Sequence, residues 1–298
     1  MVKKHNFAMI GLPWDFGASR GRPGARYAPE TIRKELSFMM NRIKKDRYYD
    51  VERFCLVDFS DVSFRDAGDV DLPYGNIDES YEVMRAEARK IYEAGEILIG
   101  LGGDHSISWP LIAAMHDAVE GPIGIIDFDA HLDLLDESYS QGKYSQSSEI
   151  FRAIELERID GKDVHQIGVR GYNYPEAYFT IKELGIGQYP PLLVREKGPR
   201  VLANEIMEKL LSRGVRQLYL TFDIDALDPA FAPGTGGDEV NGLFPQEYFE
   251  MLDVFMPYVK GLDIAEVNPL HDSNNICSIY AAKTIFRFLT SRASIAAE

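Results

Sequence analysis

Residues 122–133 read Pro-Ile-Gly-Ile-Ile-Asp-Phe-Asp-Ala-His-Leu-Asp, an apolar run that ends in a cluster of metal-capable side chains. The run has the length and hydrophobicity of a buried strand in a parallel sheet. In the extended segment after it, residues two apart point the same way, so Asp129, His131 and Asp133 can face one cavity. Because buried carboxylates need a compensating positive charge, this alternation predicts a metal site.

Two other apolar runs lead into side chains of the same kind. Residues 217–222 precede Asp223-Ile224-Asp225, and residues 96–101 precede Gly-Gly-Asp-His-Ser at 102–106, which contains His105. Taken alone, each is more commonly a helix cap or a turn. Helix caps do not readily explain why three separate strands are each followed by candidate metal ligands. Ligands of open α/β sheets bind at the carboxyl ends of the strands, which is where all three lie.

Composition excludes several classes of partner. The chain has 298 residues and a net charge of -15, from 32 Lys and Arg against 47 Asp and Glu, which argues against nucleic acid or an anionic membrane as partner. Its two cysteines, Cys55 and Cys277, are too few for a disulfide framework and suit a reducing compartment. The sequence shows neither a signal-peptide core nor a membrane-length apolar run, so we expect a soluble cytoplasmic protein.

Strand-like runs alternate with helical patterns, which is typical of a largely parallel sheet covered on both faces. We predict eight strands, at about 6–12, 54–59, 96–101, 122–128, 164–169, 191–195, 217–222 and 260–265. Helices are expected at 29–41, 79–94, 106–118, 148–157, 201–213, 245–255 and 278–291. The Gly/Pro-rich segments 11–24 and 232–242 are interpreted as loops. The predicted fold is α/β, a single three-layer α/β/α domain over residues 1–298 with a mostly parallel eight-stranded sheet.

The candidate metal ligands form an oxygen-rich set: His105, Asp129, His131, Asp133, Asp223 and Asp225. Such ligands favour Mn²⁺, although Zn²⁺, Ni²⁺ and Co²⁺ compete for them. Six ligands for two ions require sharing, and a bridging carboxylate holds two ions about 3.5–4 Å apart. Water between such ions is acidified enough to act as a nucleophile near neutral pH. The set therefore predicts two metal ions and metal-assisted hydrolysis.

These motifs resemble the ureohydrolase family, which includes arginase, agmatinase and related guanidino-compound hydrolases. The resemblance rests on residues 102–106 and 129–133, and on Thr-Phe-Asp-Ile-Asp-Ala-Leu-Asp-Pro-Ala-Phe-Ala-Pro-Gly-Thr-Gly at 221–236, followed by Ala-Glu-Val-Asn-Pro at 265–269. Arg-Pro-Gly-Ala-Arg-Tyr-Ala-Pro at 22–29 looks like the agmatinase branch. The resemblance thus covers nearly the whole chain and implies an arginase-like fold.

The resemblance also implies roles for single residues. One Mn²⁺ would be held by His105, Asp129, Asp133 and Asp223, and the other by Asp129, His131, Asp223 and Asp225, with Asp129 and Asp223 as bridges. Asp133 would also carry a proton to the departing amine. Glu266 would pair with the guanidinium of the substrate, although a lone Glu after a strand is equally well a helix cap. Asp127 is not a ligand in this register, and we expect it to support the ligands or the strand.

Two loops depart from the agmatinase pattern. Tyr-Ser-Gln-Ser-Ser at 144–148 places Gln146 where the family usually has a histidine, and glutamine cannot carry a proton near pH 7. Residues 234–242 read Gly-Thr-Gly-Gly-Asp-Glu-Val-Asn-Gly instead of the usual Gly-Thr-Gly-Thr-Pro-x-x-Gly-Gly. His271 is a candidate for the missing imidazole role, although a surface histidine is the commoner outcome. With a complete ligand set, these departures indicate an altered substrate rather than lost activity.

The resulting prediction is a binuclear Mn²⁺ amidinohydrolase that releases urea and an amine from a small cationic guanidino compound. Agmatine, giving putrescine, is the first choice. A second hypothesis is another guanidino or formimino compound, such as guanidinobutyrate or formiminoglutamate, whose anionic group would need Arg20 or Arg22 at the mouth. A third is a catalytically silent partner subunit, which only Gln146 supports. A dinucleotide site at Gly100-Leu101-Gly102-Gly103 fails because the spacing is not GxGxxG. From the family we expect a homotrimer or homohexamer.

Overall fold

The computed structural model describes residues 5–17, 21–139 and 141–295. Its strands are β1 (His5–Gly11), β2 (Arg47–Asp50), β3 (Cys55–Asp58), β4 (Val62–Asp69), β5 (Ile97–Leu101), β6 (Gly124–Phe128), β7 (Val164–Ile167), β8 (Gly187–Tyr189), β9 (Leu218–Asp223), β10 (Val259–Ala265) and β11 (Ser294–Ile295). Its α-helices are α1 (Ala28–Met40), α2 (Ile77–Glu93), α3 (Ser108–Ala118), α4 (Glu149–Ile154), α5 (Pro175–Leu184), α6 (Pro191–Lys197), α7 (Pro199–Ser212), α8 (Pro245–Phe255) and α9 (Ile276–Thr290). Short 3-10 turns lie at Ala25–Tyr27, His105–Ile107, Gly161–Asp163, Ile224–Ala226 and Met256–Tyr258.

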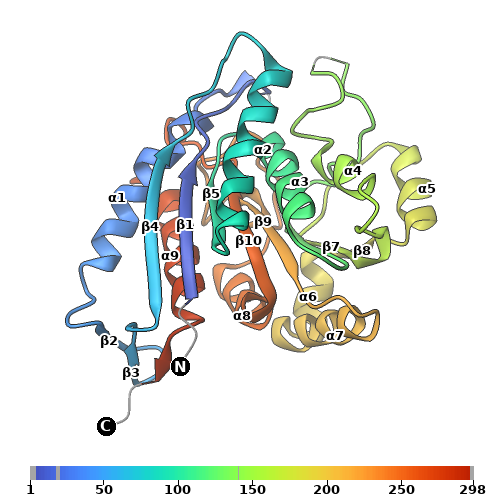
Figure 1. Cartoon of the computed structure of the whole chain (residues 1–298). Coiled ribbons are helices and arrows are strands. Elements are labelled where there is room, and N and C mark those ends of the chain that lie inside the picture. Colours follow the sequence, from blue (N-terminus) through green and yellow to red (C-terminus); the bar gives the residue numbers. More distant parts are fainter. Residues whose placement is uncertain (1–4, 18–20, 140, 296–298) are drawn as a thin grey trace.

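The main sheet has eight strands in the order β4-β1-β5-β10-β9-β6-β7-β8 (Figure 1). Each pair of neighbours is parallel. A separate three-stranded antiparallel sheet is formed by β11, β3 and β2. The predicted α/β fold with a parallel eight-stranded sheet is therefore confirmed.

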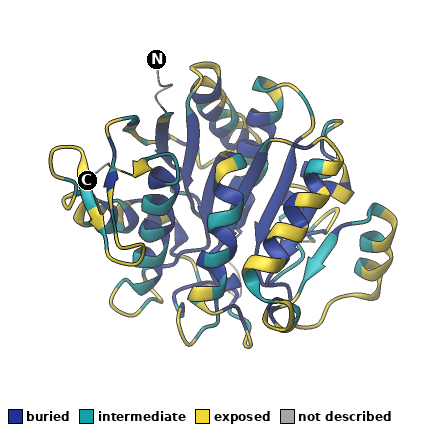
Figure 2. Cartoon of the chain, turned by 90° about the horizontal axis from the view of Figure 1, so that it is seen from below, coloured by how far each residue is buried: buried dark blue, intermediate teal, exposed yellow. Residues whose placement is uncertain are grey.

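Helices cover both faces of the main sheet, and the strands at its centre are buried (Figures 1 and 2). One apolar layer contains side chains of α1, α7, α8 and α9, and the other contains those of α2, α3 and α4. In β5, Ile97, Ile99 and Leu101 join the first layer, whereas Leu98 joins the second. Successive side chains of a strand point to opposite faces, so a continuous apolar run fills both layers.

Six of the predicted strands are found in this sheet, as β1, β5, β6, β7, β9 and β10. The predicted strand at 54–59 exists as β3, but it belongs to the small antiparallel sheet. The edge strand β4 escaped prediction because its sequence, Val-Ser-Phe-Arg-Asp-Ala-Gly-Asp, is largely polar and exposed. The predicted helices are present with ends shifted by a few residues, and α5 was not predicted.

The predicted strand at 191–195 is wrong, because these residues begin helix α6. Pro191 occupies the first turn of the helix, where its fixed φ angle is favourable, and Gly198 follows the last turn with φ 86°. A short apolar run cannot be assigned to strand or helix from periodicity alone. The eighth strand is instead β8, whose Gly-Gln-Tyr carries no apolar signature.

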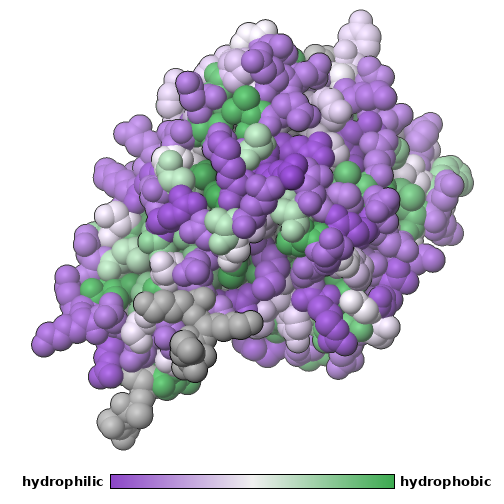
Figure 3. Space-filling view, viewed as in Figure 1, coloured by the Kyte–Doolittle hydropathy of each residue, from purple (hydrophilic) through white to green (hydrophobic). Residues whose placement is uncertain are grey.

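The face of the molecule seen in Figure 3 is mostly hydrophilic, with apolar side chains in small scattered groups. This surface agrees with the acidic composition of the chain. Within the described ranges, no helix has both the length and the hydrophobicity needed to cross a bilayer.

Candidate metal centre

The site lies at the carboxyl ends of four neighbouring strands, β5, β10, β9 and β6. His105 follows β5, Glu266 follows β10, Asp223 ends β9, and Asp129 follows β6. Because these strands are adjacent and parallel, side chains far apart in the sequence meet at one edge of the sheet. The convergence expected from the sequence is thus what the strand order produces.

One group of side chains gathers around the Nδ1 atom of His105. Asp129 Oδ2 lies 2.9 Å from this nitrogen, Asp133 Oδ2 3.2 Å and Asp223 Oδ2 3.5 Å. The imidazole and the three carboxylates are all buried. These are the residues that the family resemblance assigns to one metal ion.

A second group forms around His131, and Asp129 belongs to both. Nδ1 of His131 lies 3.1 Å from Asp225 Oδ2 and 3.4 Å from Asp129 Oδ1. Asp129 therefore turns one oxygen to each histidine, as a bridging carboxylate would. The backbone orients Asp225, whose Oδ1 accepts a hydrogen bond of 3.0 Å from the amide of Ala130.

The buried carboxylates of this cluster carry more negative charge than the neighbouring side chains can compensate. Burial, together with repulsion from Asp225 and Asp129, raises the pKa of Asp223 well above its ordinary value. The Asp225 carboxylate is the main cause that raises the pKa of His131 above its usual range. Among the described residues, no Lys or Arg forms an ion pair with these carboxylates. Such a concentration of buried negative charge is stable only if positive charge is added.

The donor atoms are also arranged for metal binding. His105 Nδ1 and Asp129 Oδ2 are buried and lie 2.9 Å apart, but within the described part of the chain neither atom forms a hydrogen bond of suitable geometry. Two sets of side chains each bring their potential ligand atoms within 4.8 Å of one another. The first set is His105, Asp129, Asp133 and Glu149, and the second is Asp129, His131 and Asp225. Imidazole and carboxylate donors at this spacing fit two divalent cations.

A hydrogen-bond chain sets the orientation of His105. Its Nε2 lies 2.8 Å from Thr221 Oγ1, which donates a hydrogen bond of 2.8 Å to Asp263 Oδ1. When Nε2 donates to Thr221, the lone pair of Nδ1 points at the carboxylates, as a metal ligand requires. Neither Thr221 nor Asp263 was expected at the site from the sequence. Thr221 stands two residues before Asp223 and therefore shares its face of β9, which was the available signal.

The backbone is unusual at two site residues. Asp133 has φ 48° and Glu266 has φ 57°, in the left-handed region that non-glycine residues rarely adopt. Close packing also explains the glycines before His105, because a Cβ on Gly103 would lie 1.6 Å from the carbonyl oxygen of Trp14. The loops that present the ligands thus combine left-handed backbone with close packing.

Glu266 joins the cluster from β10. Its carboxylate is 5% exposed, and Oε1 accepts a hydrogen bond of 3.0 Å from the amide of His105. This contact ties the end of β10 to the loop that carries His105. Burial, followed by repulsion from Asp104, raises the pKa of Glu266 well above its ordinary value.

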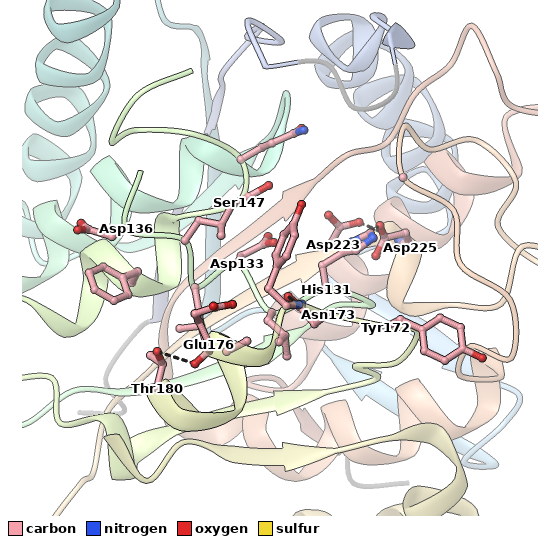
Figure 4. Close-up of a pocket in the computed structure, with 18 of the residues that line it drawn as sticks. His131, Asp133, Asp136, Ser147, Tyr172, Asn173, Glu176, Thr180, Asp223 and Asp225 are labelled. Atoms are coloured by element: carbon pink, nitrogen blue, oxygen red, sulfur yellow. Dashed lines mark hydrogen bonds and ion pairs between the residues drawn. The ribbon is translucent and has the colours of Figure 1, made fainter. Parts of the chain in front are cut away.

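A cavity of about 640 Å³ opens onto the cluster. We call the metal cluster and Glu266 the floor. Five floor residues line the cavity, namely His131, Asp133, Asp223, Asp225 and Glu266, and two lie behind them in the same cluster, namely His105 and Asp129. Residues on the surrounding loops and on α5 are called the rim: Leu135, Asp136, Gln146, Tyr172, Asn173, Tyr174 and Glu176. Figure 4 shows His131 beside Asp223 and Asp225 on one side of the cavity and Asp136 and Glu176 on the other.

The other residues singled out from the sequence differ in whether they reach the cavity. Gln146 lines the cavity, but His271 lies on an exposed turn and does not. Asp127 accepts a hydrogen bond of 2.9 Å from Gln166 Nε2 and supports the neighbouring strand. Arg22 forms an ion pair with Asp238, and Arg20 lies outside the described residues. A buried carboxylate that sequence analysis missed, Glu149, lies 3.4 Å from His105 Nδ1.

Comparisons with known proteins agree with this geometry. A model of the Arginase family matches residues 5–290. The chain is 33% identical to a mitochondrial agmatinase of Gallus gallus and 33% identical to a mitochondrial guanidino acid hydrolase of Homo sapiens, in each case over 95% of this chain, with 79% and 77% of those proteins covered. The crystal structure of formimidoylglutamase from Bacillus subtilis superposes with a TM-score of 0.83 at 27% identity, covering 97% of this chain and 87% of that one.

Proposed function

The chain belongs to the arginase family of metal-dependent amidinohydrolases, and from this premise we propose that it hydrolyses a guanidino compound with a cationic tail to urea and an amine. Agmatine, which gives putrescine, is the substrate we favour. The observation that carries this choice is the acidic rim of the cavity.

The floor residues would hold two metal ions. We assign His105, Asp129, Asp133 and Asp223 to one ion, and Asp129, His131, Asp223 and Asp225 to the other. Mn²⁺ suits this oxygen-rich set best, with Ni²⁺, Co²⁺ and Zn²⁺ as competitors. When bound, the ions supply an acidified water as the nucleophile.

The side chains of this chain perform the other steps. Glu266 lines the cavity beside the ligands and pairs with the substrate guanidinium, which places the guanidinium carbon over the cluster. Asp133 lines the cavity as well, so it can accept a proton from the attacking water and return it to the departing nitrogen. Gln146 positions the substrate through hydrogen bonds without carrying a proton.

The rim supports a substrate with a positive tail. Among the described residues that line the cavity, Asp136 and Glu176 are the charged side chains of the rim, and no Lys or Arg takes part. Asp136 already forms an ion pair with Arg152, which leaves Glu176 on the first turn of α5 to attract the tail. A carboxylate tail, as in guanidinobutyrate or formiminoglutamate, would face Glu176 with no Lys or Arg among the described lining residues to compensate it, and like charges placed together are costly.

Three guanidino compounds that differ only in the tail test this function. The Mn²⁺-loaded full chain is assayed for urea release from agmatine, from butylguanidine, whose tail is uncharged, and from 4-guanidinobutyrate. We expect kcat/KM to fall in that order, with agmatine preferred over guanidinobutyrate by at least about tenfold. A preference for guanidinobutyrate, or formamide release from formiminoglutamate at a higher kcat/KM, would show that the tail is anionic.

A chain that binds metal but has no hydrolase activity would contradict the proposed function. If the chain binds two metal ions but hydrolyses no guanidino or formimino compound, a silent partner subunit becomes the better hypothesis.

We propose a homotrimer or homohexamer for the assembly, which light scattering of the purified chain would determine.

A further inference from the structure

Glu149, the first residue of α4, is a buried carboxylate beside the metal cluster that lies outside the family ligand motifs. It is 1% exposed, and its Oε1 lies 3.4 Å from His105 Nδ1. The corresponding distance for Asp223, an expected ligand, is 3.5 Å. By position, Glu149 is thus as close to this imidazole as a proposed ligand is.

The Glu149 carboxylate has no hydrogen-bond donor to compensate its burial. Within the described part of the chain, neither of its oxygens has a hydrogen-bond partner. Among the described residues, His105 is the single group within ion-pair distance that can carry a positive charge, and that imidazole already faces Asp129 and Asp133. The nearest basic residue on α4, Arg152, pairs with Asp136 and Glu155 instead. One imidazole cannot balance several buried carboxylates, so the arrangement points to an added cation.

Local hydrogen bonds hold Glu149 in this position. The amide of Phe151 donates to the carbonyl of Asp133 at 3.3 Å, and the amide of Leu135 donates to the carbonyl of Ser147 at 2.9 Å. The start of α4 is thereby fixed to the segment that carries Asp133. A preorganised carboxylate of this kind is typical of a metal ligand.

Glu149 approaches the cluster from the protein side. The cavity is lined by Asp133, Gln146 and Ser147, whereas Glu149 is not among its described lining residues. A substrate in the cavity would therefore contact Asp133 and Gln146 rather than Glu149. This placement favours a contact of Glu149 with the metal over a contact with the substrate.

We propose that Glu149 is an additional ligand of the metal ion held by His105, Asp129 and Asp133. The inference rests on the proposed binuclear metal function. A further carboxylate makes this position richer in oxygen and more negative than the one at His131, so it favours a hard ion such as Mn²⁺ over Zn²⁺.

Calorimetric titration of the metal-stripped full chain with Mn²⁺ tests the assignment. The wild type is expected to bind two ions per chain. In Glu149→Gln, which keeps the shape but removes the charge, one ion should bind at least about tenfold more weakly while the other is little affected. Counting bound Mn²⁺ after desalting gives an independent readout that does not depend on activity.

Two matched variants separate ligand loss from a general effect. Glu266→Gln removes another buried carboxylate of the same cavity and should keep both ions, because Glu266 is proposed to bind substrate. Glu155→Gln changes an exposed Glu at the end of α4 and should behave as the wild type. If Glu149→Gln does not fold, as judged by circular dichroism, Glu149→Asp withdraws the carboxylate by one methylene and should also weaken one ion.

The outcomes distinguish the two proposals. If Glu149→Gln binds two ions within about twofold of the wild-type affinities, Glu149 is not a ligand and the proposed function stands. Tighter binding by Glu149→Gln would also overturn the assignment, since it would mean that Glu149 is a neutral acid or a repulsive neighbour. If the wild type itself binds no Mn²⁺, the metal function fails and this inference fails with it.

Discussion

The floor and the rim of the cavity are built in different ways. Floor residues stand at the ends of β5, β10, β9 and β6, and all but His131 are buried. Rim residues stand on loops and on α5, a helix with no buried residue. Because central strands are held by the core while loops vary freely, we propose that the floor fixes the reaction and the rim selects the substrate.

The largest effect should come from Asp223, the floor residue that we propose as a bridge between the two ions. Asp223→Asn should lose the binding of both ions and lower kcat/KM by more than about a hundredfold, since even partners of ligands contribute that much. Metal analysis and urea release measure both effects. Asp225→Asn should weaken mainly one ion.

Asp127→Asn is the control for Asp223→Asn, because Asp127 is an equally buried carboxylate that contacts Gln166. It should keep both ions. If Asp223→Asn still binds two ions per chain, Asp223 is not a bridging ligand. The proposed difference between a metal-binding floor and a substrate-selecting rim would then lose its main support.

A smaller effect is expected at the floor residue proposed to bind substrate. Glu266→Gln removes one charge-assisted contact with the guanidinium, which lowers kcat/KM by about ten- to a hundredfold. Metal content should stay at two ions per chain, in contrast with Asp223→Asn. A loss under about tenfold would show that the guanidinium lies elsewhere in the cavity.

The rim should respond in a way that depends on the tail of the substrate. Glu176→Gln should lower kcat/KM for agmatine by about three- to fivefold, the range of a solvent-exposed ion pair, and leave butylguanidine unchanged. Glu183→Gln, an exposed change on the same helix that does not line the cavity, is the control. Equal losses for both substrates would mean that Glu176 does not sense the tail.

The smallest effect is expected at Gln146, where this chain departs from the family. If Gln146 acts as a hydrogen-bonding positioner for agmatine, Gln146→His should change kcat/KM by less than about threefold. A rise of about a hundredfold, the size of a restored proton-transfer step, would indicate that the natural substrate is a different one. Steady-state kinetics on agmatine decide between these results.

The sequence predicted the floor well because each of its residues follows an apolar strand. It could not show that β10 and β9 lie between β5 and β6, since strand order depends on packing across the whole sheet. Glu149 was missed because it begins a helix instead of following a strand. Residues 191–195 were assigned wrongly because five residues are too few to show a helical period. The placement of Glu176 could not be predicted, because α5 has no buried face to reveal it.

The strand order also governs when the site can exist during synthesis of the chain. β5 and β6, which carry His105 and Asp129, are not neighbours, and β10 and β9 separate them by three strand spacings, about 14 Å. A nascent chain that ends before β9 therefore lacks the two strands that place His105 and Asp129 relative to each other. Metal capture becomes possible only when the last two strands insert into the middle of the sheet, a late, long-range step in folding. Uptake of the ions would thus report that β9 and β10 have joined the sheet.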